Sequence, residues 1–230
     1  MTNSMKIALF GYGKMGRLVE TIAQKNGHAS VCIFDRSFSN KAELENVDVA
    51  IDFSASDAVL DHLEACLAAN KPLVIGTTGW DHQIGKAKER VSEANGSCFY
   101  SPNFSLGIYF FQKLVSYAGL LFQRLDQYDV CGIESHHAQK KDKPSGTAIA
   151  LSHALKNQMP RVKDFAFTSI RCGHDPGNHT LIFDSQEDKI TLSHQAHNRE
   201  GFAFGALKAA EWLTNKKGFF TMDDMMKDFI

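Results

Sequence analysis

Short apolar runs alternate with helix-like segments through the first hundred residues, and this alternation limits the possible fold more than any other feature of the chain. The segments with helical spacing are 14–27, 57–71 and 81–96, and the apolar runs around them are 6–11, 29–35, 47–54, 72–79 and 97–103. Strands covered on both faces have continuous aliphatic sequences, and crossover helices make such strands parallel. The pattern therefore predicts an α/β fold with a Rossmann-like, doubly wound parallel sheet.

The pattern changes near residue 103. A long apolar helix is expected to start near Ser105, and runs with period-two alternation follow at 128–135, 165–173, 179–185 and 188–196, with one helix at 145–158. These runs predict a second α+β domain with a mixed or antiparallel sheet. A last helical segment, 202–216, is expected to pack on the first domain. The predicted division is 1–103 with 203–230 as a dinucleotide-binding domain, and 104–202 as a substrate-binding and oligomerisation domain.

Charge and cysteine content favour a soluble protein that acts on small molecules. The chain has 25 basic and 26 acidic residues without a block of like charge, so no surface for nucleic acid or an acidic membrane is expected. Its five cysteines are an odd number and form no CxxC, which is typical of reduced thiols. No stretch is long and apolar enough for a membrane span or a signal peptide. We expect a cytoplasmic location.

A glycine-rich turn follows the first apolar run. Gly11, Gly13 and Gly16 stand in GxGxxG register between a predicted strand and a predicted helix. The first glycine permits a tight turn, the second lets the backbone approach a pyrophosphate, and the third lets helix and strand pack closely. A turn without a ligand is the alternative. In the present context the pattern favours a dinucleotide site that also includes Tyr12, Lys14 and Met15.

Asp35 ends the second apolar run, 19 positions after Gly16, and Arg36 directly follows it. An acidic residue at such a place accepts a hydrogen bond from a ribose hydroxyl and favours NADH, whereas an arginine attracts the 2′-phosphate of NADPH. Having both, the chain is predicted to discriminate weakly between NADH and NADPH.

Two further loops follow predicted strands. Ligands of doubly wound folds bind beyond the carboxyl ends of the strands, so these loops are expected to line the nicotinamide end of the site. Ordinary turn chemistry would also account for their glycine and asparagine residues. The candidates are Gly76, Thr77, Thr78, Ser101, Pro102, Asn103 and Phe104.

Titratable residues are concentrated in the stretch ESHHAQKKDKPSGTA, residues 134–148. His136 and His137 are neighbours on a predicted strand and point to opposite faces, so they cannot easily share a metal, and none is expected. Pro144 restrains the entry to a helix capped by Ser145 or Thr147, and such a helix start binds anions. With the lysines of this stretch it suits a small dicarboxylate, and one histidine can act as general acid. A solvated basic loop before a capped helix is the alternative.

This stretch resembles the motif E-x-H-H-x-x-K-x-D-x-P-S-G-T-A of the dihydrodipicolinate reductase family. The resemblance extends in family order to GYGKMGR, VDVAIDFSASDAVLDHL, PLVIGTTGW, SPNFSLGIYFFQKL, IRCGHDPGNHTLIF and FAFGALKAAEWL, and so spans nearly the whole chain. It departs in its glycine loop, which is one residue shorter than the common G-x-x-G-x-x-G form, in a short segment after Asp35, and in SPN where Ala-Pro-Asn is commoner. The shorter glycine loop and the short segment after Asp35 concern the adenosine end of the cofactor site, whereas SPN is a small change. Nothing is missing from the substrate motif.

The resemblance implies reduction of 4-hydroxy-tetrahydrodipicolinate to tetrahydrodipicolinate with NADH or NADPH, in the diaminopimelate route to lysine, by a homotetramer. It implies that His136 donates or accepts the proton and that Lys140 is a second acid that assists loss of the hydroxyl as water. By the same resemblance His137 contacts the substrate, while Gly146 and Thr147 hold a substrate carboxylate.

Two other functions remain open at this point. Another two-domain NAD(P)-dependent reductase of a small acid, of the aspartate dehydrogenase kind, would act on an open-chain amino or oxo acid. A nucleotide-sensing regulator would keep the dinucleotide site and lack the chemistry, although it would not need the histidines, the lysine and the anion site of residues 134–148.

Overall fold

The computed structural model describes residues 4–34 and 41–229. The chain divides into two compact units, the first made of Met1–Ser105 with Glu200–Ile230 and the second of Leu106–Arg199. The expected limits were 1–103 with 203–230, and 104–202. Each unit is described by itself.

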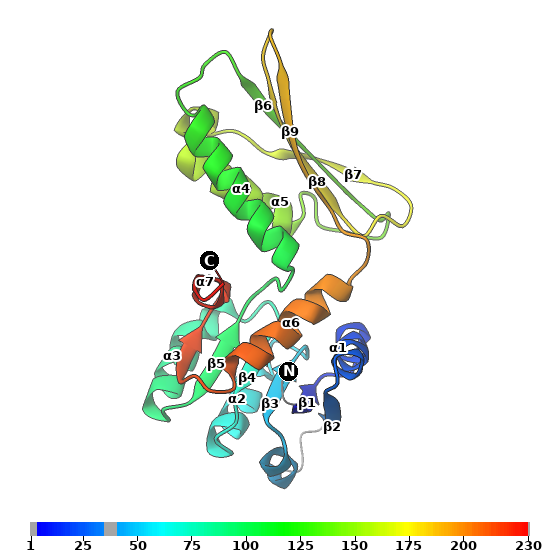
Figure 1. Cartoon of the computed structure of the whole chain (residues 1–230), viewed down its shortest axis with the longest axis vertical. Coiled ribbons are helices and arrows are strands. Elements are labelled where there is room, and N and C mark those ends of the chain that lie inside the picture. The colour runs from blue at the N-terminus through cyan, green and yellow to red at the C-terminus, as the bar shows by residue number, and fades with distance from the viewer. Residues whose placement is uncertain (1–3, 35–40, 230) are drawn as a thin grey trace. The chain divides into compact units, whose positions relative to one another are not determined.

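Unit 1 contains a six-stranded parallel sheet in the order β10-β5-β4-β3-β1-β2 (Figure 1). Every adjacent pair of its strands is parallel, so the predicted Rossmann-like sheet is confirmed. The strands are β1 (Lys6–Phe10), β2 (Ala29–Phe34), β3 (Val49–Asp52), β4 (Leu73–Ile75), β5 (Ser97–Tyr100) and β10 (Gly218–Phe220). Since β1 lies between β2 and β3, the chain order reverses beside it, and this is where doubly wound folds bind ligands.

Helices cover both faces of this sheet. α1 and α6 pack together on one face, where α6 crosses β3, β4 and β5 (Figure 1). α2 and α3 pack on the other face over a buried cluster that includes Phe10, Leu63, Ile75 and Trp80. The helices of the unit are α1 (Lys14–Lys25), α2 (Val59–Ala68), α3 (Ile84–Glu93), α6 (Glu200–Leu213) and α7 (Met222–Lys227), with short 3-10 turns η1 (Lys41–Asn46) and η2 (Asp81–Gln83).

Unit 2 contains a four-stranded mixed sheet in the order β7-β6-β8-β9. β6 and β7 are parallel, and the other two pairs are antiparallel. The strands are β6 (Asp129–His136), β7 (Phe167–Arg171), β8 (Asn178–Asp184) and β9 (Lys189–Gln195), and the helices are α4 (Leu106–Phe122), α5 (Gly146–Gln158) and the 3-10 turn η3 (Pro160–Val162). The predicted second domain with a mixed sheet is confirmed.

The two faces of this second sheet differ in character. Its inner face packs under α4 and α5, with a core that includes Leu151, Phe167, Leu181 and Phe183. Side chains alternate along strands, so one end of the inner face also carries Glu134 and its neighbours, which are described below. The outer face has exposed uncharged residues such as Ile133 and Ile170.

Two elements near the carboxyl end were not expected from the sequence. β10 has only three residues, and α7 follows it directly. β10 adds to the edge of the sheet beside β5. No helix of the described residues is long and apolar enough to cross a membrane.

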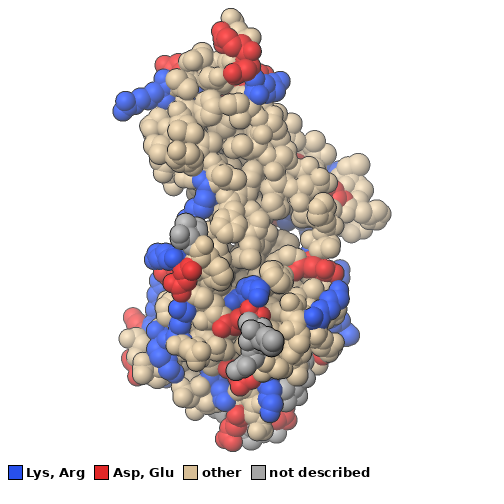
Figure 2. Space-filling view, in the orientation of Figure 1, with Lys and Arg blue, Asp and Glu red and all other residues tan. Residues whose placement is uncertain are grey.

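The face shown in Figure 2 carries acidic and basic side chains interspersed over unit 1, and a broad uncharged area over unit 2. The α4 residues Phe110, Leu114, Tyr117 and Leu121 are exposed members of this helix. On this face neither unit shows a large area of a single charge.

Candidate active site

The glycine loop of unit 1 is formed by close backbone approach. Gly11 has φ +83°, and a Cβ atom there would lie 2.5 Å from the carbonyl oxygen of Phe53. A Cβ on Gly16 would lie 2.1 Å from the carbonyl oxygen of Gly11. Both positions therefore require glycine, the first for the turn and the second for the contact between helix α1 and the loop.

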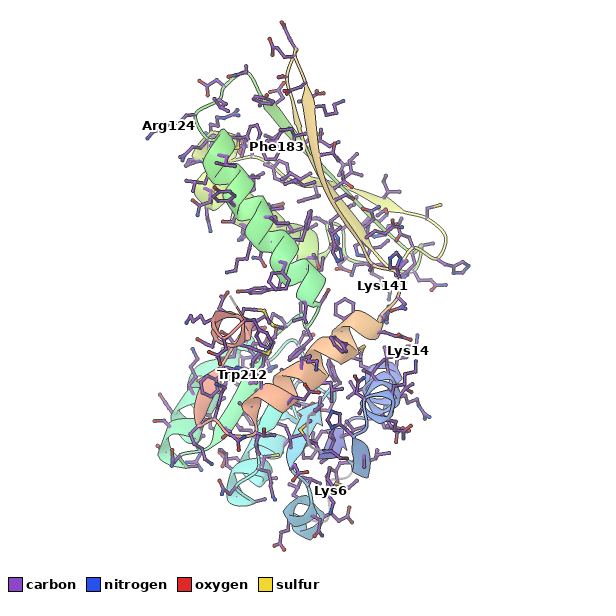
Figure 3. All side chains as sticks on the ribbon, in the orientation of Figure 1. Lys6, Lys14, Arg124, Lys141, Phe183 and Trp212 are labelled. Atoms are coloured by element: carbon purple, nitrogen blue, oxygen red, sulfur yellow. The ribbon has the colours of Figure 1, made fainter. Side chains whose placement is uncertain are left out.

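Gly13, the residue that caps α1, is in a different situation. It is exposed, and a Cβ atom there would have no neighbour within 4 Å among the described residues. As a glycine, Gly13 has no side chain to cap the first amides of α1, and the first turn of this helix has no acidic residue. Lys14 at the first helical position is exposed (Figure 3). Open space, the amide donors of a helix start and positive charge fit the pyrophosphate of a dinucleotide.

The other two predicted residues of this loop are partly buried. The hydroxyl of Tyr12 donates a hydrogen bond to Glu20, and the guanidinium of Arg17 lies 4.5 Å from the centre of the tyrosine ring. The hydrogen bond to Glu20 is the main cause that raises the pKa of Tyr12, and burial raises it further. Met15 is half-buried in the first turn of α1. Asp35 and Arg36 lie outside the described residues.

The loops after β4 and β5 leave the same edge of the sheet as the glycine loop, because all three strands are parallel. In the first loop Gly76 lies so close to the Phe53 ring that a Cβ atom there would be 2.2 Å from it, and Thr78 is exposed. The hydroxyl of Thr77 is turned inward and donates to the Asp52 carboxylate at 2.7 Å. Thr77 can therefore face a ligand with its backbone but not with its hydroxyl.

In the second loop, Ser101 donates its hydroxyl proton to the carbonyl oxygen of Asn103 at 2.6 Å. The amide oxygen of Asn103 accepts from the backbone N–H of Ser105 at 2.9 Å, and Pro102 is exposed. The Phe104 side chain is buried against Phe99, so only its backbone can serve a cofactor. These bonds fix the loop in one conformation.

Unit 2 brings together a buried polar cluster on the inner face of its sheet. Glu134 is fully buried, and one of its oxygens accepts a hydrogen bond from Nδ1 of His136 two residues later on β6. Its other oxygen accepts from the buried guanidinium of Arg171 on β7, at 2.7 Å. Burial alone would raise the pKa of Glu134, but hydrogen bonds from Arg171 and Ser169, together with the nearby positive charges, hold it below its ordinary value.

His136 is thereby fixed in one tautomer. A carboxylate only accepts, so Nδ1 of His136 carries the proton in the bond to Glu134. Nε2 then has a free lone pair in the neutral ring. Burial lowers the pKa of His136 below 6.5, although the charge of Glu134 opposes this shift. A Cβ atom on Gly177 would lie 2.9 Å from Nε2, so glycine at this position leaves that nitrogen uncovered.

His179 connects this pair to the start of α5. Its ring is 5.2 Å from that of His136 in an edge-on arrangement, and its Nε2 lies 3.2 Å from the hydroxyl of Ser145. Burial, followed by the charge of His136, lowers the pKa of His179 to about 4. His179 is therefore neutral near pH 7.

Ser145 caps α5, and it is one of the two residues, Ser145 and Thr147, that the sequence predicted for this cap. Its hydroxyl oxygen accepts from the backbone N–H of Ala148 at 3.2 Å. Gly146 begins the helix, is exposed, and has open space where a Cβ would stand; Thr147 follows it and is half-buried. The first turn has no acidic residue. This helix start can receive a carboxylate.

Lys140 belongs to the loop between the cluster and α5. Its ammonium group pairs with Asp142 at 2.9 Å, and this hydrogen bond is the main cause that lowers the pKa of Asp142. Arg171 donates to the backbone oxygen of Asp142 at 2.6 Å with the same nitrogen that serves Glu134. The loop that carries Lys140 is thus tied to the partner of His136.

His137 directly follows His136, just past the end of β6. Its backbone N–H donates to the carbonyl oxygen of Asp175 at 2.8 Å. Its Nδ1 is buried without a hydrogen-bond partner among the described residues, so a ligand can satisfy it. Of the histidines expected to be surface or packing residues, His153 and His197 are exposed, and His194 is half-buried beside Phe111.

Glu134, His136 and His179 have ligand-type atoms within 4.8 Å of one another, the one such group among the described residues. Both carboxylate oxygens of Glu134 already accept from His136 and Arg171. The group is therefore better suited to hold and move a proton than to bind an ion.

Comparisons with known proteins identify the chain. Residues 5–104 match the family model for the N-terminus of dihydrodipicolinate reductase, and residues 107–226 match the model for its C-terminus. This chain belongs to the dihydrodipicolinate reductase family.

Individual relatives and a solved structure support the same family. A protein of Christiangramia forsetii, named 4-hydroxy-tetrahydrodipicolinate reductase, is 38% identical and covers 97% of this chain and 98% of its own length. One of the same name from Thermosipho africanus is 36% identical, covering 97% and 99%. The dipicolinate-bound dihydrodipicolinate reductase of Paenisporosarcina sp. TG-14 has the same fold, with TM-score 0.80, 24% identity and coverage of 96% and 99%.

Sequence reasoning about the family motif did not assign roles to Glu134, Arg171 and His179. The strand register brings them together, since Glu134 is paired with His179 across β6 and β8, and His136 with Arg171 across β6 and β7. A glutamate two positions before a histidine on a buried strand was the available signal, because such a carboxylate needs partners.

Proposed function

We propose that this chain reduces 4-hydroxy-tetrahydrodipicolinate to tetrahydrodipicolinate with NADH or NADPH, in the diaminopimelate route to lysine. The observation that carries the proposal is the chain of contacts from Ser145 through His179 to His136, Glu134 and Arg171, and on to the loop of Lys140. It joins an anion-binding helix start to two groups that can transfer protons.

The proposed reaction consumes one hydride and one proton and releases the hydroxyl as water. The reduced nicotinamide supplies the hydride when bound. Residues 11–16 offer the space and amide donors for its pyrophosphate, with the backbone of the loops after β4 and β5 beside it. The proposal includes both NADH and NADPH, because the sequence has Asp35, which favours NADH, next to Arg36, which favours NADPH.

His136 and Lys140 are proposed as the two groups that handle protons. Glu134 holds the Nδ1 proton of His136, so exchange with the substrate takes place at Nε2. The ammonium group of Lys140 donates to the departing hydroxyl, and Asp142 holds it in place. Gly146 and Thr147 at the start of α5 receive a substrate carboxylate, and His137 contacts the substrate.

The test is the initial rate of loss of reduced-nicotinamide absorbance. The substrate is generated in situ from pyruvate and aspartate semialdehyde, and NADH and NADPH are compared in parallel. We expect turnover that requires this substrate. Binding of NADH without turnover on any substrate would instead favour a nucleotide sensor, and activity on oxaloacetate with ammonia would favour an aspartate-dehydrogenase-like enzyme.

Substitutions test the roles of the two groups. His136→Gln and Lys140→Ala should each lower kcat by about 10² or more, a usual contribution of general acid–base catalysis. Affinity for NADH should stay at the level of the parent chain, since both residues lie in unit 2. Unchanged turnover in both variants would contradict the assignment.

We also propose a cytoplasmic homotetramer that binds neither nucleic acid nor membrane. The outer face of the unit 2 sheet supports an assembly, because Cys131, Ile133 and Ile170 are exposed there, and the charged Asp129 stands at the first position of β6. Uncharged exposed faces of this kind are typical of subunit contacts. Light scattering after gel filtration should give four times the mass of the chain, and Ile133→Lys should lower it.

A further inference from the structure

Unit 1 contains a buried polar network that neither the glycine loop nor the unit 2 cluster includes. Asp52, the last residue of β3, is fully buried. Its Oδ1 accepts from the backbone N–H of Ser54 at 2.8 Å, from the Ser54 hydroxyl at 2.6 Å and from the Thr77 hydroxyl at 2.7 Å. Its Oδ2 accepts from Nδ1 of His62 at 2.7 Å.

This carboxylate joins the loops that follow two neighbouring strands. Ser54 follows β3 and Thr77 follows β4, and the Ser54 N–H also lies 2.9 Å from the Thr77 hydroxyl. Both loops leave the edge of the sheet where the glycine loop begins. Asp52 thus fixes the distance between two of the segments that face the proposed dinucleotide.

The glycine loop rests on the same segment. The position of a Cβ on Gly11 would be 2.5 Å from the carbonyl oxygen of Phe53, and that of a Cβ on Gly76 would be 2.2 Å from the Phe53 ring. The Phe53 N–H donates to the carbonyl oxygen of Phe10 at 2.9 Å. With contacts this close, a displacement of residues 53 and 54 would move the glycine loop and the loop after β4 together.

His62 on α2 completes the arrangement. Its ring stacks on Phe10, the residue before Gly11, with centroids 4.2 Å apart and planes 13° apart. Its Nδ1 donates to Asp52. One side chain therefore connects the strand end that begins the glycine loop with the carboxylate that holds the other two loops.

We propose that Asp52 and His62 are positioning residues for the dinucleotide, acting through Phe53, Ser54 and Thr77. Burying a carboxylate is costly unless it is fully hydrogen-bonded, and this one has its donors on two cofactor-facing loops. An aliphatic pair would fill the same space without fixing the loops. The inference rests on the proposed dinucleotide-binding function of unit 1.

The experiment uses the full-length chain and measures NADH binding by the fluorescence of the bound nucleotide. His62→Leu removes the donor at Nδ1, whereas His62→Asn keeps an N–H donor at nearly the same place. Asp52→Asn replaces one acceptor oxygen by a donor. Asp61→Asn, on the exposed side of α2, is the matched control.

We expect the Kd and the KM for NADH to rise about tenfold in Asp52→Asn and His62→Leu, the effect of losing a hydrogen bond to a charged group. Saturating NADH should restore kcat to within about twofold, because uniform binding is what is lost. His62→Asn and Asp61→Asn should bind NADH like the parent chain. Binding of dipicolinate, a probe of unit 2, should be unchanged in every variant.

Urea unfolding separates positioning from a structural role. If the variants lose stability but the folded protein keeps the parent Kd for NADH, the inference is wrong. The same holds if His62→Asn binds as weakly as His62→Leu. If the parent chain itself does not bind NADH, the proposed function fails first, and the two failures are thereby distinguished.

Discussion

Replacing Glu134 by glutamine is the most direct test of the buried cluster in unit 2. Glutamine has nearly the same shape but carries no charge, and one of its two terminal atoms is a donor. Glu134 is fully buried, and the side chain of its partner Arg171 is 4% exposed. The change therefore leaves a buried guanidinium without its counter-charge.

The expected loss of stability follows from these contacts. Removing one member of a buried ion pair costs about 3–5 kcal/mol. Arg171 keeps its hydrogen bonds to the carbonyl oxygens of Ile170 and Asp142, and the glutamine oxygen can still accept from it. We therefore expect Glu134→Gln to lower the free energy of unfolding by about 3 kcal/mol, the lower end of this range. This is a large part of the total stability of a folded domain, which is typically about 5–15 kcal/mol.

The same change should reverse the tautomer of His136. If the glutamine oxygen accepts from Arg171, its NH₂ group faces Nδ1 of His136, which must then accept and leave its proton on Nε2. In hydrolase triads an equivalent change of tautomer lowers kcat by about 10⁴. We expect a decrease of at least about 10² in Glu134→Gln, because the proton needed at Nδ1 is displaced.

Three measurements check this reasoning. Urea unfolding gives the stability, nitrogen NMR of the His136 ring gives the tautomer, and the reduced-nicotinamide assay gives kcat. Glu187→Gln, in the exposed turn between β8 and β9, is the control and should match the parent chain in all three. A Glu134→Gln variant that loses less than about 1 kcal/mol and keeps kcat within about twofold would refute the account of the cluster.

Three further predictions concern His179, the glycine loop and Ser145. The pKa of His179 is about 4 in the folded chain against 6.5 in the unfolded chain, so the unfolded chain takes up a proton more readily. The free energy of unfolding should therefore be unaffected above pH 6.5 and fall by about 3 kcal/mol towards pH 4. Unfolding of His179→Gln at a series of pH values should not show this decrease. Gly11→Ala should lower stability by more than about 1 kcal/mol, because Gly11 has a positive φ and a Cβ there would contact Phe53. Gly13→Ala should unfold like the parent chain but bind NADH more weakly, since a Cβ there meets no described residue. Equal unfolding midpoints for the two variants would contradict the geometry. Ser145→Ala should lose about 1 kcal/mol through the helix cap and bind dipicolinate less tightly, and calorimetric binding equal to that of the parent would exclude the anion site.

Much of the fold could be predicted because buried parallel strands and their crossover helices have distinct sequence patterns. The sheet of unit 1 and the mixed sheet of unit 2 follow from those runs. β10 could not be predicted, since three residues of a strand carry no periodicity, and its place beside β5 depends on packing at the sheet edge.

The candidate site was predictable only in part, for a related reason. Residues 11–16 and 134–148 are contiguous motifs, so local chemistry singles them out. Arg171 and His179 reach Glu134 through strand pairing, and His62 reaches Asp52 from a helix ten positions later. Register and side-chain direction decide such contacts, and neither can be read from a single sequence.

The position of Arg171 between two functional groups limits how this site can evolve. One nitrogen of its guanidinium serves both Glu134, the partner of His136, and the backbone of the loop that carries Lys140. A change at Arg171 would disturb both proton-handling groups at once, so drift at any one of these positions is constrained by the others. Among related proteins we expect Glu134, His136, Lys140 and Arg171 to be inherited or replaced as a set.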